Sequence, residues 1–328
     1  MKHDPDPVIR LLEGYRATAL VRAALELDLF TRLPGTAASV ARAARCSERG
    51  VRIALDALSA MGLVRKSGAR YAHTPLSRAF LSRRSPASIA EVSRLFVHER
   101  MWRAYFDLPG AIRAGRSVLA RDAHAPNQEF WLDFARITAR QSLVWAEALA
   151  RMVRPGRGTR VLDVACGSGV YGLAMAARGA DVTLFDQAYV LRETRRVARG
   201  RRARFLAGDI FRRAWGGPYD VVILSHVLHH FDARGCADLL RRARAALAPG
   251  GTLAIQEFVP DDARKSRLRQ LMFGVTMLLW TKAGDAYTWR ELRGMIGRAG
   301  FRRARISGWS EPRQVILAEK ARSRIPDP

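Results

Sequence analysis

The sequence is poor in lysine, in cysteine and in long apolar runs. Only five of its 56 basic residues are lysine, so 51 are arginine, a bias that GC-rich codon usage produces without selection for a ligand. The three cysteines, Cys46, Cys166 and Cys236, form no C-x-x-C pair. This excludes a disulfide framework and a zinc knuckle, and we expect no metal. Scarce cysteine favours a reducing, cytoplasmic setting.

No stretch of the chain is apolar for long enough to cross a bilayer. The longest apolar run, 271–280, is about half of the roughly 20 residues that a membrane span needs. Residues 1–7 are polar and lack the apolar centre of a signal peptide. We therefore expect no membrane association, and the length of 328 residues predicts about two domains.

The chain has a large excess of positive charge, with 56 basic and 30 acidic residues and a formal net charge of +26. Such an excess is typical of proteins that bind nucleic acid or an anionic surface. Here it is spread along the chain, apart from a cluster of arginines within 192–204. A charge run is usually a solvated face, so we do not expect a nucleic-acid partner.

The N-terminal part of the chain has the pattern of a winged helix. Apolar residues recur at helical spacing in three segments, 8–30, 37–44 and 51–61. A predicted hairpin at 63–73 follows them. In isolation this order is a DNA-binding signature. The third helix is rich in alanine, leucine and methionine, which suit burial better than contact with base edges. We expect residues 1–100 to form a structural or dimerisation domain.

Residues 101–154 are predicted to be a helical connector that contributes to a substrate pocket. Aromatic residues at such spacing usually form core, and otherwise they line a pocket for a flat substrate. The apolar run 271–280 has the same two interpretations, a core helix or a cover over the acceptor. The large aromatic residues of the connector are Trp102, Tyr105, Phe106, Phe130, Trp131, Phe134 and Trp145.

Residues 155–328 alternate between short apolar segments and helical stretches. The predicted strands are 161–164, 182–185, 204–206, 221–224 and 252–255. Such alternation indicates an α/β fold with a doubly wound parallel sheet. In such sheets ligands bind at the carboxyl ends of the strands, so residues that follow the strands are the candidates for a site.

The sharpest motif is the run V-L-D-V-A-C-G-S-G at 161–169, where a strand leads through a glycine turn into a helix. Gly167 and Gly169 let the backbone approach a ligand, where a Cβ would collide. Asp163 suits a ligand with an amino or sulfonium cation better than a pyrophosphate. The spacing alone is weak evidence for such a ligand.

Acids after the next two strands strengthen this evidence. Asp186 comes 17 residues after Gly169, where an acid binds a ribose diol in such sheets. Asp209 follows the third strand, beside Ile210 and Phe211, an apolar pair that could hold an adenine ring. Three acids at successive strand ends predict a nucleoside-containing cofactor.

Together these residues resemble the two-domain small-molecule O-methyltransferases that use S-adenosylmethionine, including the caffeic acid and acetylserotonin types and their bacterial relatives. The resemblance covers nearly the whole chain. It implies a Rossmann-like class I methyltransferase domain over 155–328, behind an α-helical winged-helix dimerisation domain, and a homodimer. Further motifs that carry it are D-x-x-x-V-L at 186–191, G-D at 208–209, L-H at 228–229, A-L-x-P-G-G at 246–251 and A-G-F at 299–301.

The resemblance also implies how the cofactor is held. Gly167 and Gly169 would contact its methionine portion, Asp186 its ribose, and Asp209 with Ile210 its adenine. Ser225, at the end of the fourth strand, would also touch it.

The same resemblance implies that His229 is a general base and that Glu257 orients it. A histidine with an ordinary pKa near 6.5 can accept a proton at neutral pH. His230 as the base and a structural role for both His229 and His230 stay open, as does the choice for His226 between the cofactor side and the core. The second catalytic glutamate of the plant enzymes, expected just before Thr288, is missing, and Asp285 is the candidate substitute.

We therefore expect an S-adenosylmethionine-dependent O-methyltransferase that acts on a hydroxyl of an aromatic or polyketide-like small molecule in secondary metabolism. The alternatives within the fold are a C- or N-methyltransferase. Outside that substrate class, the isoelectric point of about 11.4 motivates a nucleic-acid methyltransferase, and the winged helix a regulator that senses a metabolite.

Overall fold

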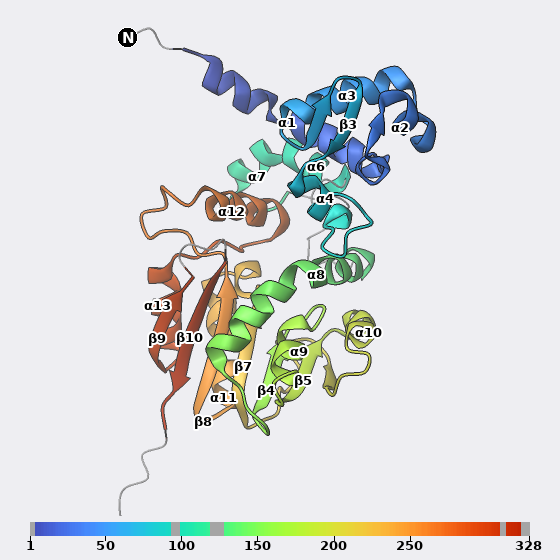
Figure 1. Ribbon diagram of the computed structural model, residues 1–328. Helices are drawn as coiled ribbons and strands as arrows, with labels where there is room; N and C mark the ends of the chain where they lie inside the picture. The colour runs from blue at the N-terminus through green and yellow to red at the C-terminus, as the bar shows by residue number, and fades with distance from the viewer. Residues whose placement is uncertain (1–3, 93–98, 119–127, 309–312, 323–328) are drawn as a thin grey trace, which may run out of the picture. The chain divides into compact units, whose positions relative to one another are not determined.

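The computed structural model describes residues 4–92, 99–118, 128–308 and 313–322, and the chain divides into two compact units, Met1–Arg103 and Ala104–Pro328 (Figure 1). Most of the predicted connector belongs to the second unit. The side chains of Phe130 and Trp131, two of its aromatic residues, lie outside the described part. None of the helices described there is long and apolar enough to span a membrane.

The first unit has the predicted order of helices followed by a hairpin. Its small sheet has the order β1-β3-β2, with antiparallel pairing. Ser47 caps the third helix as its position predicts, because its side chain accepts a hydrogen bond from the Gly50 N–H. The elements are α1 Asp6–Glu26, η1 Phe30–Arg32, β1 Gly35–Thr36, α2 Ala37–Ala44, α3 Glu48–Ala60, β2 Val64–Ser67, β3 Arg70–His73, α4 Pro75–Phe80 and η2 Ala90–Val92.

Helix α3 packs its apolar face into the core of this unit, where Leu55 and Leu58 are fully buried. Its outer face is engaged in contacts within the unit. Asp56 pairs with Arg52 at 3.1 Å and accepts a hydrogen bond from the Tyr71 hydroxyl at 2.7 Å. In a DNA-binding winged helix, the helix in the position of α3 would contact base edges. Here Asp56, in the middle of that helix, is instead hydrogen-bonded to the hairpin through Tyr71.

The second unit contains a seven-stranded sheet with the order β6-β5-β4-β7-β8-β10-β9, in which β4 to β8 pair in parallel and β10 and β9 pair antiparallel. The predicted α/β sheet is confirmed. Its strands are β4 Arg160–Val164, β5 Asp181–Asp186, β6 Arg204–Ala207, β7 Tyr219–Ser225, β8 Leu247–Glu257, β9 Phe301–Ser307 and β10 Gln314–Lys320.

The helices of this unit cover both faces of the sheet. They are α7 Leu108–Ala114, α8 Gln128–Val153, α9 Val170–Ala176, α10 Ala188–Val197, η3 Leu228–His230, α11 Ala233–Ala246, α12 Leu268–Trp280 and α13 Trp289–Arg298, while α6 Glu99–Phe106 crosses from one unit to the other. Helices α8, α9 and α10 pack on one face, and α11 and α13 on the other (Figure 1).

Neighbouring residues of the central strands alternate between the two faces. In β7, Val222 and Leu224 pack with α11, whereas Val221 and Ile223 pack with α8 and α9. A parallel strand that is buried on both faces needs an apolar residue at every position. This requirement explains why the central strands read as continuous apolar runs and not as an alternating pattern.

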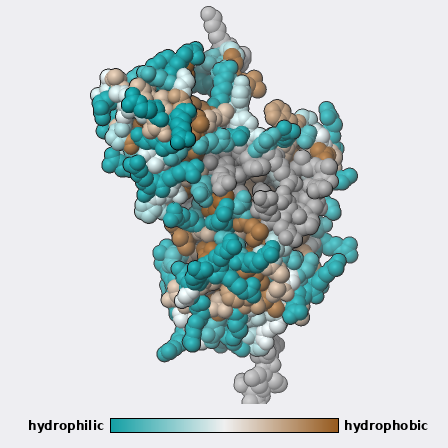
Figure 2. Space-filling view, turned by 90° about the vertical axis from the view of Figure 1, so that its right-hand side faces the viewer, coloured by the Kyte–Doolittle hydropathy of each residue, from teal (hydrophilic) through white to brown (hydrophobic). Residues whose placement is uncertain are grey.

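The surface of both units is mainly hydrophilic on the face that Figure 2 shows, without one dominant apolar area there. The arginine cluster of 192–204 belongs to this kind of surface. Arg196 pairs with Glu193 at 2.8 Å, and the Arg195 guanidinium lies 4.6 Å from the ring centre of Phe205. Part of the cluster thus makes contacts within its own helix and strand.

Candidate functional site

The glycine turn between β4 and α9 has the geometry that its sequence predicts. Gly167 and Gly169 have φ of +53° and +78°, which glycine adopts without steric cost. A Cβ on Gly169 would come within 2.7 Å of Thr194 Cγ2, whereas a Cβ on Gly167 would meet nothing within 4 Å. Gly169 is therefore needed for packing, and Gly167 faces open space in which a ligand can approach the backbone.

Asp163 lies beneath this turn. Its side chain is completely buried, and its Oδ2 accepts a hydrogen bond from the Gly172 N–H at 2.8 Å. Burial raises its pKa to about 8, with Gly172 lowering it and the nearby Asp186 raising it. Oδ2 thus ties β4 to the first turn of α9, while Oδ1 is buried and has no hydrogen-bond partner in the described part of the chain. Direct contact of Asp163 with the cofactor stays a prediction.

Asp186 ends β5 beside the turn. Its carboxylate accepts hydrogen bonds from the N–H groups of Gly167 at 2.9 Å and Gln187 at 2.7 Å. Burial raises its pKa to about 6. These two bonds fix the carboxylate next to the open space over Gly167, which fits the predicted binding of a ribose diol.

Asp209 and Ile210 follow β6 on the same edge of the sheet. Asp209 accepts a hydrogen bond from the Phe211 N–H at 2.7 Å, which shapes the loop, and Ile210 is half-buried. Because β4, β5 and β6 are adjacent parallel strands, their carboxyl ends lie side by side. The glycine turn, Asp186 and the pair Asp209–Ile210 therefore lie at one edge of the sheet, where they fit the predicted binding of S-adenosylmethionine.

His229 and Glu257 form a buried pair at the ends of β7 and β8. His229 Nδ1 lies 2.7 Å from Glu257 Oε2, and Glu257 Oε1 accepts hydrogen bonds from the N–H groups of Leu228 at 3.0 Å and His229 at 3.4 Å. An ionised carboxylate only accepts, so the imidazole donates through Nδ1, and Nε2 is the nitrogen free to take a proton. The two predicted residues are thus brought together, 28 positions apart.

Aromatic rings surround this pair. The Phe273 ring of α12 meets the His229 ring edge-on at 4.7 Å between centres, and Phe258 lies 4.4 Å from Phe273. His226 lies 6.2 Å from His229 and has φ of +55°, a strained backbone for a non-glycine residue. An apolar helix therefore borders the histidine, and both predicted interpretations of this helix, a core helix and a cover over the acceptor, remain open.

The same groups have the composition of a metal site. The nearest ligand atoms of His226, His229 and Glu257 all lie within 4.8 Å of one another. A cation bound there would compete with the 2.7 Å contact that sets the tautomer of His229. The absence of a metal stays a prediction from the sequence.

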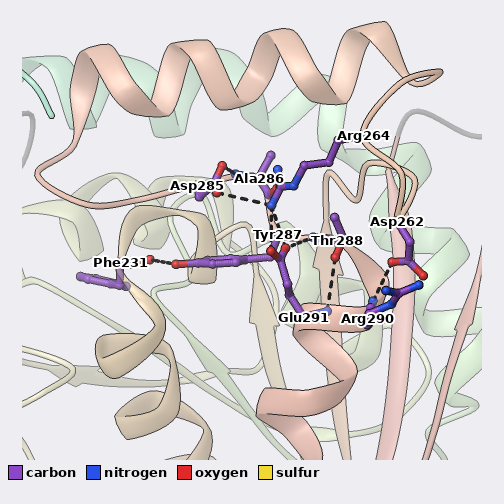
Figure 3. A network of polar contacts seen from close by, with 9 residues as sticks. All are labelled: Phe231, Asp262, Arg264, Asp285, Ala286, Tyr287, Thr288, Arg290 and Glu291. Atoms are coloured by element: carbon purple, nitrogen blue, oxygen red, sulfur yellow. Dashed lines mark hydrogen bonds and ion pairs between the residues drawn. The ribbon is translucent and has the colours of Figure 1, made fainter. Parts of the chain in front are cut away.

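A second polar network lies behind this region (Figure 3). Arg264 binds Glu291 at 2.8 Å and reaches Asp285 at 3.5 Å, and the Tyr287 hydroxyl donates to the Phe231 carbonyl oxygen at 2.6 Å. Asp285 faces Arg264 here, not the His229–Glu257 pair. Residues 283–286 and the face of α12 that carries Leu271 and Gly274 line an open hollow of about 560 Å³.

Sequence reasoning missed the residues next to His226. Tyr171, at the start of α9, has its ring centre 6.2 Å from that of His226, and Phe258 lies 5.2 Å from it. The Arg313 guanidinium lies 5.5 Å from the centres of both Phe258 and Trp145. Among 51 arginines no sequence signal could single out this one, because its neighbours come from four separate segments.

Comparisons with protein families match both units. Residues 113–302 match the model of an O-methyltransferase domain, and residues 9–83 match that of an O-methyltransferase dimerisation domain. The two matches follow the order that the sequence motifs imply.

Individual proteins resemble the chain over almost its full length. An acetylserotonin O-methyltransferase of Mus musculus molossinus is 32% identical, over 94% of this chain and 87% of that protein. The tetracenomycin polyketide synthesis 8-O-methyl transferase TcmO of Streptomyces glaucescens is 27% identical, over 97% of each. The structure of human N-acetylserotonin methyltransferase in complex with SAM superposes with a TM-score of 0.87, 22% identity and coverage of 98% and 99%, a likeness of fold.

Proposed function

This chain belongs to the family of S-adenosylmethionine-dependent O-methyltransferases, and on that premise we propose that it methylates a phenolic hydroxyl of an aromatic, polyketide-like small molecule. The observation that carries the proposal is the 2.7 Å contact between His229 and Glu257. This pair provides a general base. Methylation of a hydroxyl needs such a base, whereas a carbon nucleophile that is activated by its own aromatic ring needs it less.

The cofactor, when bound, supplies an electrophilic methyl group on a sulfonium. Asp186 and the turn at Gly167 and Gly169 bind and orient its ribose and methionine portions, while Asp209, Ile210 and Ser225 complete the surface. Asp163 acts on the site from below, by holding the turn against α9. Orientation of two reactants accounts for much of the acceleration in such a transfer.

The acceptor's proton is handled by the histidine pair. Glu257 accepts the Nδ1 hydrogen of His229 and thereby presents a basic Nε2 to the acceptor hydroxyl. When His229 takes the proton, the buried carboxylate stabilises the resulting imidazolium. Leu228 and His229 hold the carboxylate in place through their backbone N–H groups.

Two features support an aromatic acceptor. The Phe273 ring lies next to His229 and packs on the Phe258 ring, which gives this region an aromatic lining, and the relative TcmO acts in polyketide synthesis by its name. A flat, apolar acceptor would be held by stacking and by exclusion of water. We propose that the chain acts in secondary metabolism and, because its sequence has few cysteines, in the cytoplasm.

The test is formation of S-adenosylhomocysteine from S-adenosylmethionine with a panel of hydroxylated benzenes, naphthalenes and anthraquinones. We expect turnover with at least one phenol, loss of turnover in His229→Ala, and unchanged binding of S-adenosylhomocysteine by that variant. His230→Ala, next to the base, is the control and should keep most activity. Normal turnover by His229→Ala would contradict the assignment.

The first unit supports a homodimer. Helix α1 exposes Val8, Leu11, Leu12 and Tyr15 along its first half, with 81% of Leu11 accessible, and apolar residues at i, i+3, i+4 and i+7 form one face. A second copy of the chain would bury this face. In light scattering after gel filtration, Leu11→Glu with Leu12→Glu should give a monomer and the control Glu13→Gln a dimer. A monomeric parent chain would disprove the proposal.

A further inference from the structure

Three polar side chains near His229 have buried atoms that make no hydrogen bond of good geometry within the described part of the chain. They are the hydroxyl of Tyr171, both ring nitrogens of His226 and Nη1 of Arg313. All of these atoms are buried. An unsatisfied buried polar group is costly, and three such groups together indicate a site for a ligand with hydrogen-bond acceptors.

Aromatic rings hold these groups in place. The Arg313 guanidinium lies 5.5 Å from the ring centres of both Trp145 and Phe258, and Phe258 lies 5.2 Å from His226. Contact through the face of a guanidinium leaves its N–H groups at the edge, where they can bind a planar anion. Tyr171 meets His226 edge-on at 6.2 Å, so the polar groups converge.

The charge of Arg313 is uncompensated within the described residues. None of the ion pairs found there involves it. Burial lowers the pKa of Arg313, the neighbouring Tyr171 opposes this by raising it, and the positive charge of Arg269 lowers it further. His226 stays neutral at pH 7, because burial and then Arg313 lower its pKa well below the ordinary value. A buried cation that pairs with no acid among the described residues favours an anion as its partner.

The position of the cluster indicates which anion. Tyr171 lies two residues after Gly169, and the hydroxyls of Ser225 and Ser142 are near enough to lower its pKa, which burial raises overall. The cluster therefore adjoins the methionine end of the predicted cofactor surface. A guanidinium fork, a hydroxyl and an imidazole N–H are donors that together suit the two oxygens of a carboxylate.

We propose that Arg313, with Tyr171 and His226, forms a carboxylate-binding position beside the reacting centre, occupied by the methionine carboxylate of the cofactor. The inference rests on the proposed function, since it presumes this cofactor. A carboxylate on the acceptor has the same chemistry and is the other source. Arg313 is a binding residue in this account and takes no part in proton transfer.

The experiment is calorimetric titration of the full chain with three probes: S-adenosylhomocysteine, its carboxyl methyl ester, and 5′-methylthioadenosine, which lacks the amino acid portion. The parent chain should bind the methyl ester at least tenfold more weakly than S-adenosylhomocysteine. Arg313→Met keeps an apolar stem between the two rings and should lose at least tenfold for S-adenosylhomocysteine, but less than twofold for 5′-methylthioadenosine. Arg293→Met, an exposed arginine of α13, is the matched control and should change neither.

The outcomes separate the possible sources and the possible errors. If S-adenosylhomocysteine binding is unchanged in Arg313→Met but binding of salicylate to the loaded protein is lost, the carboxylate belongs to the acceptor. Equal losses for S-adenosylhomocysteine and 5′-methylthioadenosine, or no loss for any carboxylate, overturn the proposal. If Arg313→Met fails to fold, Arg313→Lys is used instead, because lysine keeps the charge without the guanidinium fork. It should reduce the difference in affinity between S-adenosylhomocysteine and its carboxyl methyl ester. Failure of the parent chain to bind 5′-methylthioadenosine would instead count against the proposed cofactor site.

Discussion

Replacing Glu257 by Gln changes one atom at the centre of the proposed mechanism. Glu257 uses Oε1 for the N–H groups of Leu228 and His229 and Oε2 for Nδ1 of His229. In Glu257→Gln the amide oxygen must stay on the two backbone donors, because the alternative would leave both buried N–H groups without an acceptor. The amide NH2 then faces Nδ1, which becomes an acceptor, and the proton moves to Nε2.

The expected loss follows from this inverted tautomer. With Nε2 protonated, His229 cannot accept the acceptor's proton, and general base catalysis of about 10²–10⁴-fold disappears from kcat. The affinity for S-adenosylhomocysteine should stay within about twofold, because Glu257 lies outside the predicted cofactor surface. Glutamate and glutamine side chains have nearly the same size, so the packing is kept and the melting temperature should change little.

The assay is the rate of S-adenosylhomocysteine formation at pH 7 to 9 with two phenols of similar shape. One phenol has an ordinary pKa, and the other carries a nitro group and ionises at the assay pH. The loss should be large for the first phenol and small for the second, which needs no base. Glu257→Asp, which keeps the charge on a shorter stem, should recover part of the activity. A loss below threefold for the ordinary phenol, or equal losses for both, would refute the reasoning.

Three further predictions follow from the packing around the site. Asp163→Asn should stabilise the chain increasingly as the pH rises from about 4 to 8. The buried carboxyl, with a pKa of about 8, takes up a proton on folding, which costs about 1.4 kcal/mol of stability per pH unit over that window. If the variant's melting temperature differed from that of the parent chain by the same amount at pH 5 and at pH 8, this prediction would be wrong. Gly284→Ala should lower kcat at least tenfold, because the added Cβ would collide with the His229 carbonyl oxygen. The control Gly297→Ala adds a Cβ that meets nothing within 4 Å and should stabilise α13 by about 0.5–1 kcal/mol. Similar rates for the two variants would disprove the packing argument. Prolonged dialysis against a chelator should leave the rate unchanged, and added Zn²⁺ should inhibit by binding His226, His229 and Glu257; loss of activity with the chelator would show that a metal is required.

Much of the fold could be predicted, because the local signals of the first unit and of the five parallel strands agreed with the final structure. The segment 37–44 was predicted as a helix and is α2, and the five predicted strands are present as β4 to β8. Strands β9 and β10 were missed, although the A-G-F motif lies at the start of β9. The sequence of β9, F-R-R-A-R-I-S, is half-polar, and that of β10, Q-V-I-L-A-E-K, begins next to residues without a clear turn signal. Both strands pair antiparallel at the edge of the sheet.

The candidate site could be predicted in part, where residues follow strands directly. Gly167, Asp186, Asp209, His229 and Glu257 stand at strand ends, and adjacent parallel strands bring such positions to one edge. Asp163 shows the limit of this reasoning. Its place in the motif predicts contact with the ligand, which stays a prediction, whereas only the packing of α9 on β4 shows that one oxygen of its carboxylate accepts from the Gly172 N–H.

The sequence by itself determined the order of the N-terminal helices and hairpin, the five parallel strands and the glycine turn, because these depend on local backbone preferences and on short motifs, while the family resemblance pointed to His229 and Glu257. Only the tertiary structure decided which groups are left buried without partners. Arg313 is one arginine among 51 in the sequence, and nothing local distinguishes it. It becomes a candidate binding residue because α8, α9, the end of β7 and the segment after β8 meet around it, and burial of a charge is a property of that whole arrangement.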